Sequence, residues 1–455
     1  MPDNTLNSQK GYNTADIRKE IILLMLPIIA ENFLQTFTDL IATAMVGRLI
    51  DLDISAQGMS SKLTNLVYYI FRGTSVALVI LIAKRLSKDG VEACRTIFEK
   101  TAVATTVIAL VLGGFIFMAP ETSLSVFTKD AALIAHAVDY LKILVFCLPF
   151  WGITVCVASA FQAKGDTKTP MLVAVFVNIL NTFLCWGLIF GNLGMPEMGY
   201  LGAAAALVIS RAVGCVISIY LLYSSRWGMF ALKGKRTQEE KLLQRVYAIA
   251  LPNAGEWCVW QVATIILSRI ILSYGQAEFA AYQLGVQVES MLEIPAVGFG
   301  TAAMVLISRA IGLNDEKLYR AYKKEMMRIC LLISIITTAM LVLMPRMCMR
   351  VLTDSENLIA IGIGYLVIAG LSTIPMNIGK VYNGILRSSG NNTVPLKVQM
   401  LCMWGIRITA SLICCYVLKL PLISIWCCFT ADQFIKFFIT RTITNRKKIF
   451  GDVNA

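Results

Sequence analysis

The sequence contains one histidine in 455 residues, and only 15% of its residues are charged. A single histidine excludes the HExxH zinc motif, which needs two. The chain also lacks the GxxxxGK[ST] nucleotide loop and the GxSxG motif of serine hydrolases. A membrane-embedded transferase would need a His, Asp or metal cluster at a membrane face, and no such pattern is found. We therefore expect neither an enzyme nor direct use of ATP.

The thirteen cysteines do not form a metal-binding or redox pattern. No CxxC occurs, and no Cys and His residues stand at zinc spacing. Most lie inside apolar segments, as do the pairs Cys414 with Cys415 and Cys427 with Cys428. We interpret them as small buried apolar residues, and we expect no cofactor or bound metal.

Hydrophobic residues make up 57% of the chain, and its mean hydropathy is +0.69. A helix needs about 20 apolar residues to cross a bilayer. Segments of that length recur throughout, which predicts an all-α, polytopic membrane protein with twelve transmembrane helices. The segments are 21–45, 55–83, 98–119, 131–161, 169–190, 199–223, 243–273, 279–308, 326–344, 358–385, 395–418 and 421–440.

The net charge of +13 could suggest nucleic acid, but the placement of the basic residues indicates membrane topology instead. Basic loops such as "KRLSKDG" and "AKGDTK" and the tail "RTITNRKK" fall on one side if the N-terminus is cytoplasmic. The first twenty residues are polar and show no targeting peptide. We predict a multi-pass protein of the plasma membrane with both termini cytoplasmic and no nucleic-acid partner.

The two halves of the chain repeat each other at an offset of 225 residues. "LPIIAENFLQ" begins at Leu26 and "LPNAGEWCVW" at Leu251, and the same offset pairs Gly165 with Gly390. Six spans separate equivalent residues, so the repeats are parallel. We predict two pseudo-symmetric six-helix bundles, 1–223 and 242–455, joined by a cytoplasmic linker at 224–241. A cavity is expected between the halves.

Acidic residues inside the apolar segments are candidates for function. Glu256 interrupts an apolar run, where a charge costs about 3 kcal/mol on insertion scales. Glu31 is its equivalent in the first half, and Asp39 lies two helical turns further along nearly the same face. Each could hold a proton, a sodium ion or a cationic substrate, or make a structural hydrogen bond instead.

The second half contains a mixed set of buried charges. Glu289 and Glu293 are spaced i, i+4, so they share a helical face. Arg269, Lys380 and Arg407 are predicted within spans of the same half. This balance predicts a polar cavity with paired charges, although structural ion pairing explains any single member equally well.

A few further residues have weaker indications of function. His136 is predicted near the outer end of the fourth span and is expected to be an interfacial residue rather than a ligand or switch. Asp432 and Lys436 are spaced to neutralise each other locally. Trp257 could stack on an organic cation, or it could pack against lipid or core side chains.

Several motifs together resemble the multidrug and toxic compound extrusion (MATE) transporters of bacteria. They are "VGRL" after the first helix, "FQAKGDTKTP" after the fourth, "GMPEMGYLGAAAALVISR" before the sixth and "GILRSSGNNTVP" after the tenth. The resemblance implies secondary active efflux by alternating access. Inward flow of protons or sodium ions would drive export of amphipathic, often cationic, drugs or metabolites.

The ion sites of this chain depart from the family pattern. In one branch an Asp stands where this sequence has Ala42, and Asp39 is a candidate to replace it. That branch also has an Asn and Asp pair in the fifth helix, of which this chain keeps Asn178 and places Thr182 at the acid. These departures leave the coupling ion, proton or sodium, open.

A second branch carries acids in the seventh and tenth helices. Here Glu256 supplies the first, while the tenth helix offers Asn377 and Lys380. Lys380 is a candidate to replace a bound cation in one state. A flippase for lipid-linked sugars or cell-wall precursors, from the same wider superfamily, is the alternative function. We expect small organic substrates, the lipid bilayer as the surroundings, and a monomer.

Overall fold

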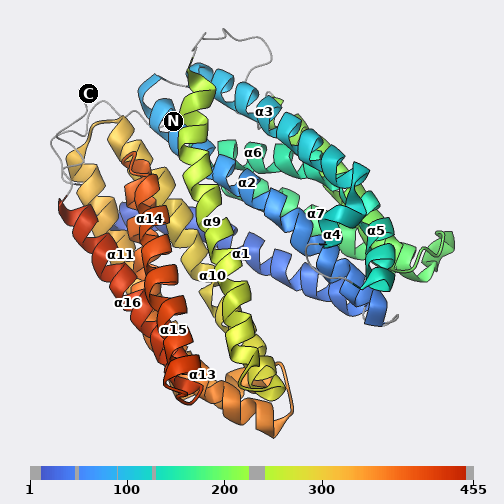
Figure 1. Cartoon of the computed structure of the whole chain (residues 1–455). Coiled ribbons are helices and arrows are strands. Elements are labelled where there is room, and N and C mark those ends of the chain that lie inside the picture. The colour runs from blue at the N-terminus through green and yellow to red at the C-terminus, as the bar shows by residue number, and fades with distance from the viewer. Residues whose placement is uncertain (1–11, 47–50, 90, 126–129, 225–240, 447–455) are drawn as a thin grey trace. The chain divides into compact units, whose positions relative to one another are not determined.

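The computed structural model describes residues 12–46, 51–89, 91–125, 130–224 and 241–446. All regular structure in these ranges is helical (Figure 1). The elements are α1 (Thr14–Val46), α2 (Asp51–Asp89), α3 (Val91–Met118), α4 (Pro120–Ser125), α5 (Ala131–Leu144), α6 (Cys147–Lys164), α7 (Lys168–Phe190), η1 (Asn192–Gly194), α8 (Tyr200–Tyr223), α9 (Leu242–Leu272), α10 (Gln276–Gly312), α11 (Glu316–Leu343), α12 (Pro345–Arg350), α13 (Glu356–Ser388), α14 (Thr393–Cys402), η2 (Met403–Ile408), α15 (Thr409–Leu412), η3 (Ile413–Val417) and α16 (Ile423–Arg446).

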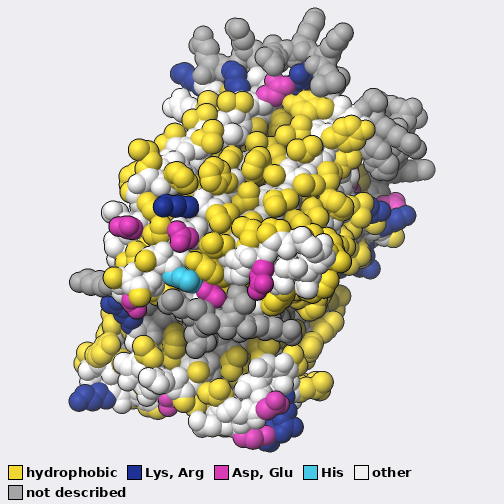
Figure 2. Space-filling view, turned by 90° about the vertical axis from the view of Figure 1, so that its right-hand side faces the viewer, with side chains coloured by type: hydrophobic (Ala, Val, Ile, Leu, Met, Phe, Trp, Pro, Cys, Tyr) yellow, Lys and Arg dark blue, Asp and Glu magenta, His cyan; other side chains and the backbone are white. Residues whose placement is uncertain are grey.

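Eleven helices of the described chain are long and apolar enough to cross a membrane, and α5 with α6 make a twelfth span bent by 47°. This confirms the twelve predicted helices. The bend has a local cause, because Pro149 in the first turn of α6 has no N–H to donate to the carbonyl of Val145. Hydrophobic side chains cover most of the face in Figure 2, as expected for a surface in contact with lipid.

The helices repeat the 225-residue offset of the sequence. Equivalent helices begin at the same place in each half because the same pattern of apolar, glycine and proline residues folds in the same way. The pairs of starting residues are Asp51 and Gln276 (α2, α10), Val91 and Glu316 (α3, α11), Pro120 and Pro345 (α4, α12), Ala131 and Glu356 (α5, α13), and Lys168 and Thr393 (α7, α14).

The chain forms two compact units. The N-terminal unit comprises residues 27–258, and the C-terminal unit comprises 1–26 with 259–455. These differ from the predicted lobes 1–223 and 242–455 because the first parts of α1 and α9 are each assigned to the unit of the other repeat. The predicted linker 224–241, apart from its two end residues, lies outside the described residues.

The first part of α9 packs against α2 within the N-terminal unit. Val246 and Ala250 are buried with Ala77. A Cβ atom at Gly73 would lie 2.4 Å from the carbonyl oxygen of Ala250, so the two backbones meet where only glycine fits.

Ion pairs and a hydrogen bond connect the first part of α1 to the rest of the C-terminal unit. The carboxylate of Glu20 accepts hydrogen bonds from Arg309 at 2.7 Å and from the hydroxyl of Tyr322 at 2.6 Å. Arg18 pairs at 2.7 Å with Glu325, which is buried. Polar contacts with α10 and α11 therefore hold this segment.

Candidate functional site

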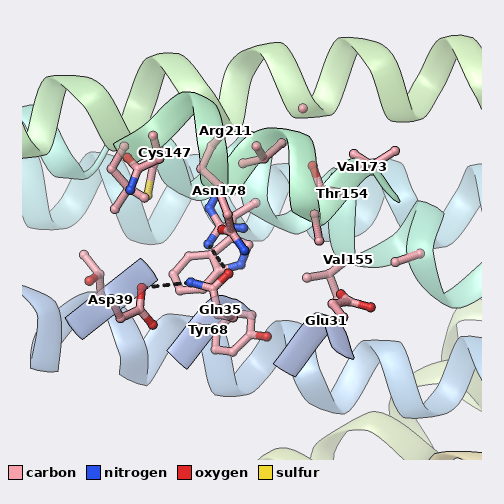
Figure 3. A pocket seen from close by; sticks show the side chains of 18 of the residues that line it. Glu31, Gln35, Asp39, Tyr68, Cys147, Thr154, Val155, Val173, Asn178 and Arg211 are labelled. Atoms are coloured by element: carbon pink, nitrogen blue, oxygen red, sulfur yellow. Dashed lines mark hydrogen bonds between the residues drawn. The ribbon is translucent and has the colours of Figure 1, made fainter. Parts of the chain in front are cut away.

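A pocket of about 540 Å³ lies inside the N-terminal unit (Figure 3). Residues from α1, α2, α5, α6, α7 and α8 line it. Its volume is in the range of small-molecule sites. Three of the predicted site residues, Glu31, Asp39 and Asn178, line this pocket.

The two acids come from one face of α1. Glu31 and Asp39 are eight residues apart, and Gln35 lies between them, so all three side chains face the pocket. Gln35 donates a hydrogen bond from Nε2 to Oδ1 of Asp39 at 2.8 Å. Within the described chain, no hydrogen bond or ion pair reaches the carboxylate of Glu31. Arg211 acts on this carboxylate only electrostatically, so its oxygens are available to contact a ligand.

Two arginines also line the pocket, and aromatic rings hold both of them. The guanidinium of Arg211, on α8, lies 5.1 Å from the ring of Trp151 and makes a long contact of 3.5 Å with Oε1 of Gln35. The guanidinium of Arg72, on α2, lies 4.5 Å from the ring of Trp257. Trp257 thus faces a cation, but one that belongs to the protein.

The α7 side of the pocket carries buried amides. Asn178 is 6% exposed, and its Nδ2 donor has no hydrogen-bond partner. Thr182 stands where one branch of the family has an acid. It carries no charge, and its hydroxyl donates a hydrogen bond to the backbone carbonyl of Asn178 at 3.0 Å. Asn181, one turn away, accepts from Ser210 at 3.3 Å. An orphaned buried donor suits an acceptor atom of a ligand or a water.

The acids predicted in the second half are already partnered. Glu293 and Lys380 form an ion pair at 3.1 Å, and the hydroxyl of Tyr365 donates to Glu289. Asn377 is 2% exposed and donates from Nδ2 to Oγ of Ser334 at 3.1 Å. The structure therefore gives each of these predicted site residues a partner within the C-terminal unit.

Asp432 is at the centre of a second charged cluster. Its side chain is 0% exposed and lies 2.8 Å from Arg407 and 3.7 Å from Lys436. The Arg407 contact is ionic rather than a well-aligned hydrogen bond. Arg407 also lies 4.6 Å from the ring of Phe429 and belongs to the π-helical segment η2. The predicted local pair of Asp432 and Lys436 is thus present, with an arginine as the closer partner.

Glu256 lies on the part of α9 that belongs to the N-terminal unit. It is partly buried and has an electrostatic or hydrogen-bonding contact, but it is not among the residues that line the pocket. No group of three or more His, Cys, Asp or Glu side chains among the described residues could hold a metal ion.

The model of the MatE family matches the chain twice, over residues 27–186 and 252–413. The two matches begin 225 residues apart, at the offset of the internal repeat. The chain belongs to the MatE family. This confirms the resemblance to MATE transporters.

Several known proteins resemble this MatE protein over nearly its whole length. The probable multidrug resistance protein NorM of Thermotoga maritima is 26% identical over 418 residues, covering 92% of this chain and 90% of the relative. The uncharacterized transporter YisQ of Bacillus subtilis is 25% identical over 434 residues, with 93% of each chain covered. Proteins of this kind are transporters of the membrane rather than enzymes.

Solved structures show the same fold. A MOP superfamily transporter from Pyrococcus furiosus, described as having a binding pocket of reverse polarity, has a TM-score of 0.86 at 16% identity, with 96% of this chain and 98% of that one covered. A point mutant of the Vibrio cholerae MATE transporter VcmN has a TM-score of 0.86 at 16% identity, covering 96% and 99%.

Sequence reasoning missed important pocket residues of this MatE protein. Arg211 stands midway along the apolar helix α8, and that position was a usable signal, because a charged residue inside a span needs a partner or a cavity. Gln35 and Asn181 gave no comparable signal, since uncharged amides occur in many spans. Their positions become meaningful only when α1, α7 and α8 are placed together.

Proposed function

We propose that this MatE protein is a secondary active antiporter in which a coupling cation and an amphipathic, cationic cargo compete for the acidic wall of the N-terminal pocket. The observation that carries the proposal is the Glu31 carboxylate, which lines the pocket and has no hydrogen bond or ion pair from the described protein. An ionised carboxylate inside a span is costly unless a proton, a metal cation or a cationic ligand neutralises it.

Competition for one site yields exchange without further machinery. A proton or sodium ion bound at Glu31 cancels the charge that attracts the cargo, so the two ligands weaken each other's binding by the same factor. Asp39 provides a second carboxylate on the same face, held by Gln35. Aromatic surface is present for an organic cation, because the rings of Tyr68 and Trp151 stack at 4.0 Å beside the pocket.

The C-terminal unit supports this assignment by contrast. Two of its acids are neutralised by cations that belong to the protein, Lys380 at Glu293 and Arg407 at Asp432, and Glu289 accepts a hydrogen bond from Tyr365. A lysine in this position acts as a tethered substitute for a bound cation. We therefore assign the exchangeable cation to the pocket at Glu31 and Asp39, and a structural role to the charges of the C-terminal unit.

The protein is proposed to act as a monomer in the plasma membrane, with both termini cytoplasmic. The basic residues of the loops support this orientation. On it, α1 runs outward, and the pocket residues from Glu31 to Thr43 extend from mid-membrane toward the outer face. The membrane potential would then assist the steps that carry net positive charge inward.

The two pocket arginines favour a second candidate function. Arg72 and Arg211 could hold the phosphate of an anionic, lipid-linked cargo, as a flippase requires. Both functions use the same pocket, but the antiporter prefers a positively charged cargo and the flippase a negatively charged one. Anionic amphiphiles therefore belong in the same assay as organic cations.

The test is transport by purified protein in vesicles under an imposed pH or sodium gradient, with a panel of fluorescent organic cations and anionic amphiphiles. We expect gradient-driven movement of cations, and its reduction to the level of empty vesicles in Glu31→Gln. Glu316→Gln removes an acid whose side chain is 52% exposed at the start of α11, and should transport normally. Glu256→Gln, measured in parallel, tests the acid that the sequence analysis identifies as the leading candidate for the site.

Wild-type exchange rates and gradient dependence in Glu31→Gln would contradict the proposal. Selective movement of anionic amphiphiles would instead support the flippase. Comparison of transport under a pH gradient with transport under a sodium gradient identifies the coupling ion.

A further inference from the structure

The single histidine pairs with a buried acid at the ends of α5 and α2. Nε2 of His136 lies 2.6 Å from Oδ1 of Asp53, and the two side chains are 27% and 7% exposed. On the proposed orientation this is the outer end of the N-terminal unit, and the histidine (cyan in Figure 2) reaches the surface. The sequence predicted an interfacial histidine and did not indicate the Asp53 contact.

The pair is connected to the pocket through α8. The ring of Tyr200 stacks on His136, with centroids 4.2 Å apart, and its hydroxyl donates to the backbone oxygen of His136 at 3.3 Å. Tyr200 also stacks on Tyr140, which lines the pocket, with ring centroids 6.2 Å apart. On α2, Gln57 also lines the pocket and lies one turn from Asp53. The pair therefore stands one helical turn from residues that line the pocket, on both α2 and α5.

Acids are the nearest other charges around this pair. Asp139, on α5, lies within electrostatic reach of Tyr200, as does Asp53 itself. Within the described part of the chain, no other charged group is paired with His136. Other described charged groups on the outer halves of α2 and α5 and on the neighbouring segments are Asp130, which is the N-cap of α5, and Lys62, Lys142, Glu121 and Glu197.

The chemistry of the pair suits the binding of a single proton. When Asp53 is ionised, Nε2 of His136 carries the hydrogen that faces it, and Nδ1 is the ring position that can gain a proton. Adding a proton there breaks no bond and turns a hydrogen-bonded pair into an ion pair. Histidine is the side chain whose charge ordinarily changes between about pH 5 and 8. A buried carboxylate such as Asp53 gains from the added positive charge.

We propose that Asp53 and His136 form a proton-binding site beyond the outer end of the N-terminal pocket, which protons entering from outside occupy before they reach Glu31 and Asp39. The inference rests on the proposed function, because it assumes that protons from outside reach the pocket. It adds His136 as a titratable group on that path. Its consequence is that the dependence of exchange on external pH follows the protonation of His136.

Because the chain has one histidine, the site can be observed directly. Protein labelled with ¹³C and ¹⁵N in histidine, purified by a tag without histidine, gives one imidazole signal in the NMR spectrum. We expect that signal to titrate in one step, at the pH where the external-pH dependence of exchange has its midpoint. In Asp53→Asn both midpoints should move together. An imidazole signal that does not change between about pH 5 and 8 would overturn the site.

His136→Gln keeps a hydrogen-bond donor toward Asp53 but cannot gain a proton. At a fixed pH or sodium gradient we expect it to retain exchange, but to lose the step in exchange rate that follows the protonation of His136 in the wild type. Lys142→Gln removes an exposed charge from the same helix and should keep the wild-type pH profile. An unchanged profile in His136→Gln refutes the inference and leaves the proposed function standing. Absence of exchange in the wild type refutes the proposed function, whereas the NMR titration still decides whether the proton binds.

Discussion

The Arg407 and Asp432 pair offers a quantitative test of the structural role assigned to the C-terminal charges. Asp432 has no exposure to solvent, so Arg407→Met leaves a buried carboxylate with Lys436 at 3.7 Å as its nearest cation. Removing one partner of a buried pair costs about 3–5 kcal/mol. Because Lys436 remains, we expect the lower end, about 3 kcal/mol, which is more than a hundredfold in the unfolding equilibrium.

The double variant Arg407→Met with Asp432→Asn removes both charges together. Replacing a whole buried pair by uncharged side chains is often neutral, so we expect its stability within about 1 kcal/mol of the wild type. The double-mutant cycle, completed by Asp432→Asn alone, then yields a coupling energy of at least about 2 kcal/mol. As a control, Arg320→Met breaks an exposed pair with Glu316, which should change stability by less than about 1 kcal/mol.

The assay combines unfolding in mixed detergent micelles with transport by the same variants in vesicles. If the cluster only supports the fold, the double variant transports with the wild-type dependence on the gradient. A stable double variant that has lost gradient-driven exchange would refute the reasoning, because it would place a coupling site at Asp432. Additive single effects in the cycle would refute the ion pair itself.

Two further predictions concern packing and pH. Gly202→Val should lower the unfolding temperature, because a Cβ at Gly202 would lie 2.5 Å from the backbone oxygen of Leu188, whereas Gly58→Ala, in open space, should leave it unchanged or raise it slightly. Burial raises the pKa of Asp315, but hydrogen bonds from the backbone of Leu318 and from Tyr12 outweigh this and hold the pKa below its ordinary value. That contribution to stability is present above the ordinary carboxyl pKa and is lost as pH falls through the lowered value. The protection of backbone amides at the start of α1 against hydrogen exchange, relative to the intrinsic rate at the same pH, should therefore fall in acid, and in Asp315→Asn at neutral pH.

The spans and the repeat could be predicted from the sequence because both follow from local chain chemistry. A run of about 20 apolar residues in a bilayer can satisfy its backbone only as a helix. The offset of 225 residues then correctly predicts where α10, α11, α12, α13 and α14 begin. The spacing of Glu31 and Asp39 likewise indicates one helical face without knowledge of any neighbour, and both line the same pocket.

The long-range partners of the charged side chains were decided only by the tertiary structure. Gln35 and Arg211 are 176 residues apart, Lys380 and Glu293 are 87 apart, and His136 lies 83 residues from Asp53. No pattern along one helix specifies which face of a distant helix packs against it. Whether a carboxylate inside a span can bind a ligand or is already neutralised therefore depends on the helices packed around it. Sequence alone located Glu31, Glu293 and Asp432 inside the spans, and packing separated Glu31, which lines the pocket, from Glu293 and Asp432, which pair with cations of the protein.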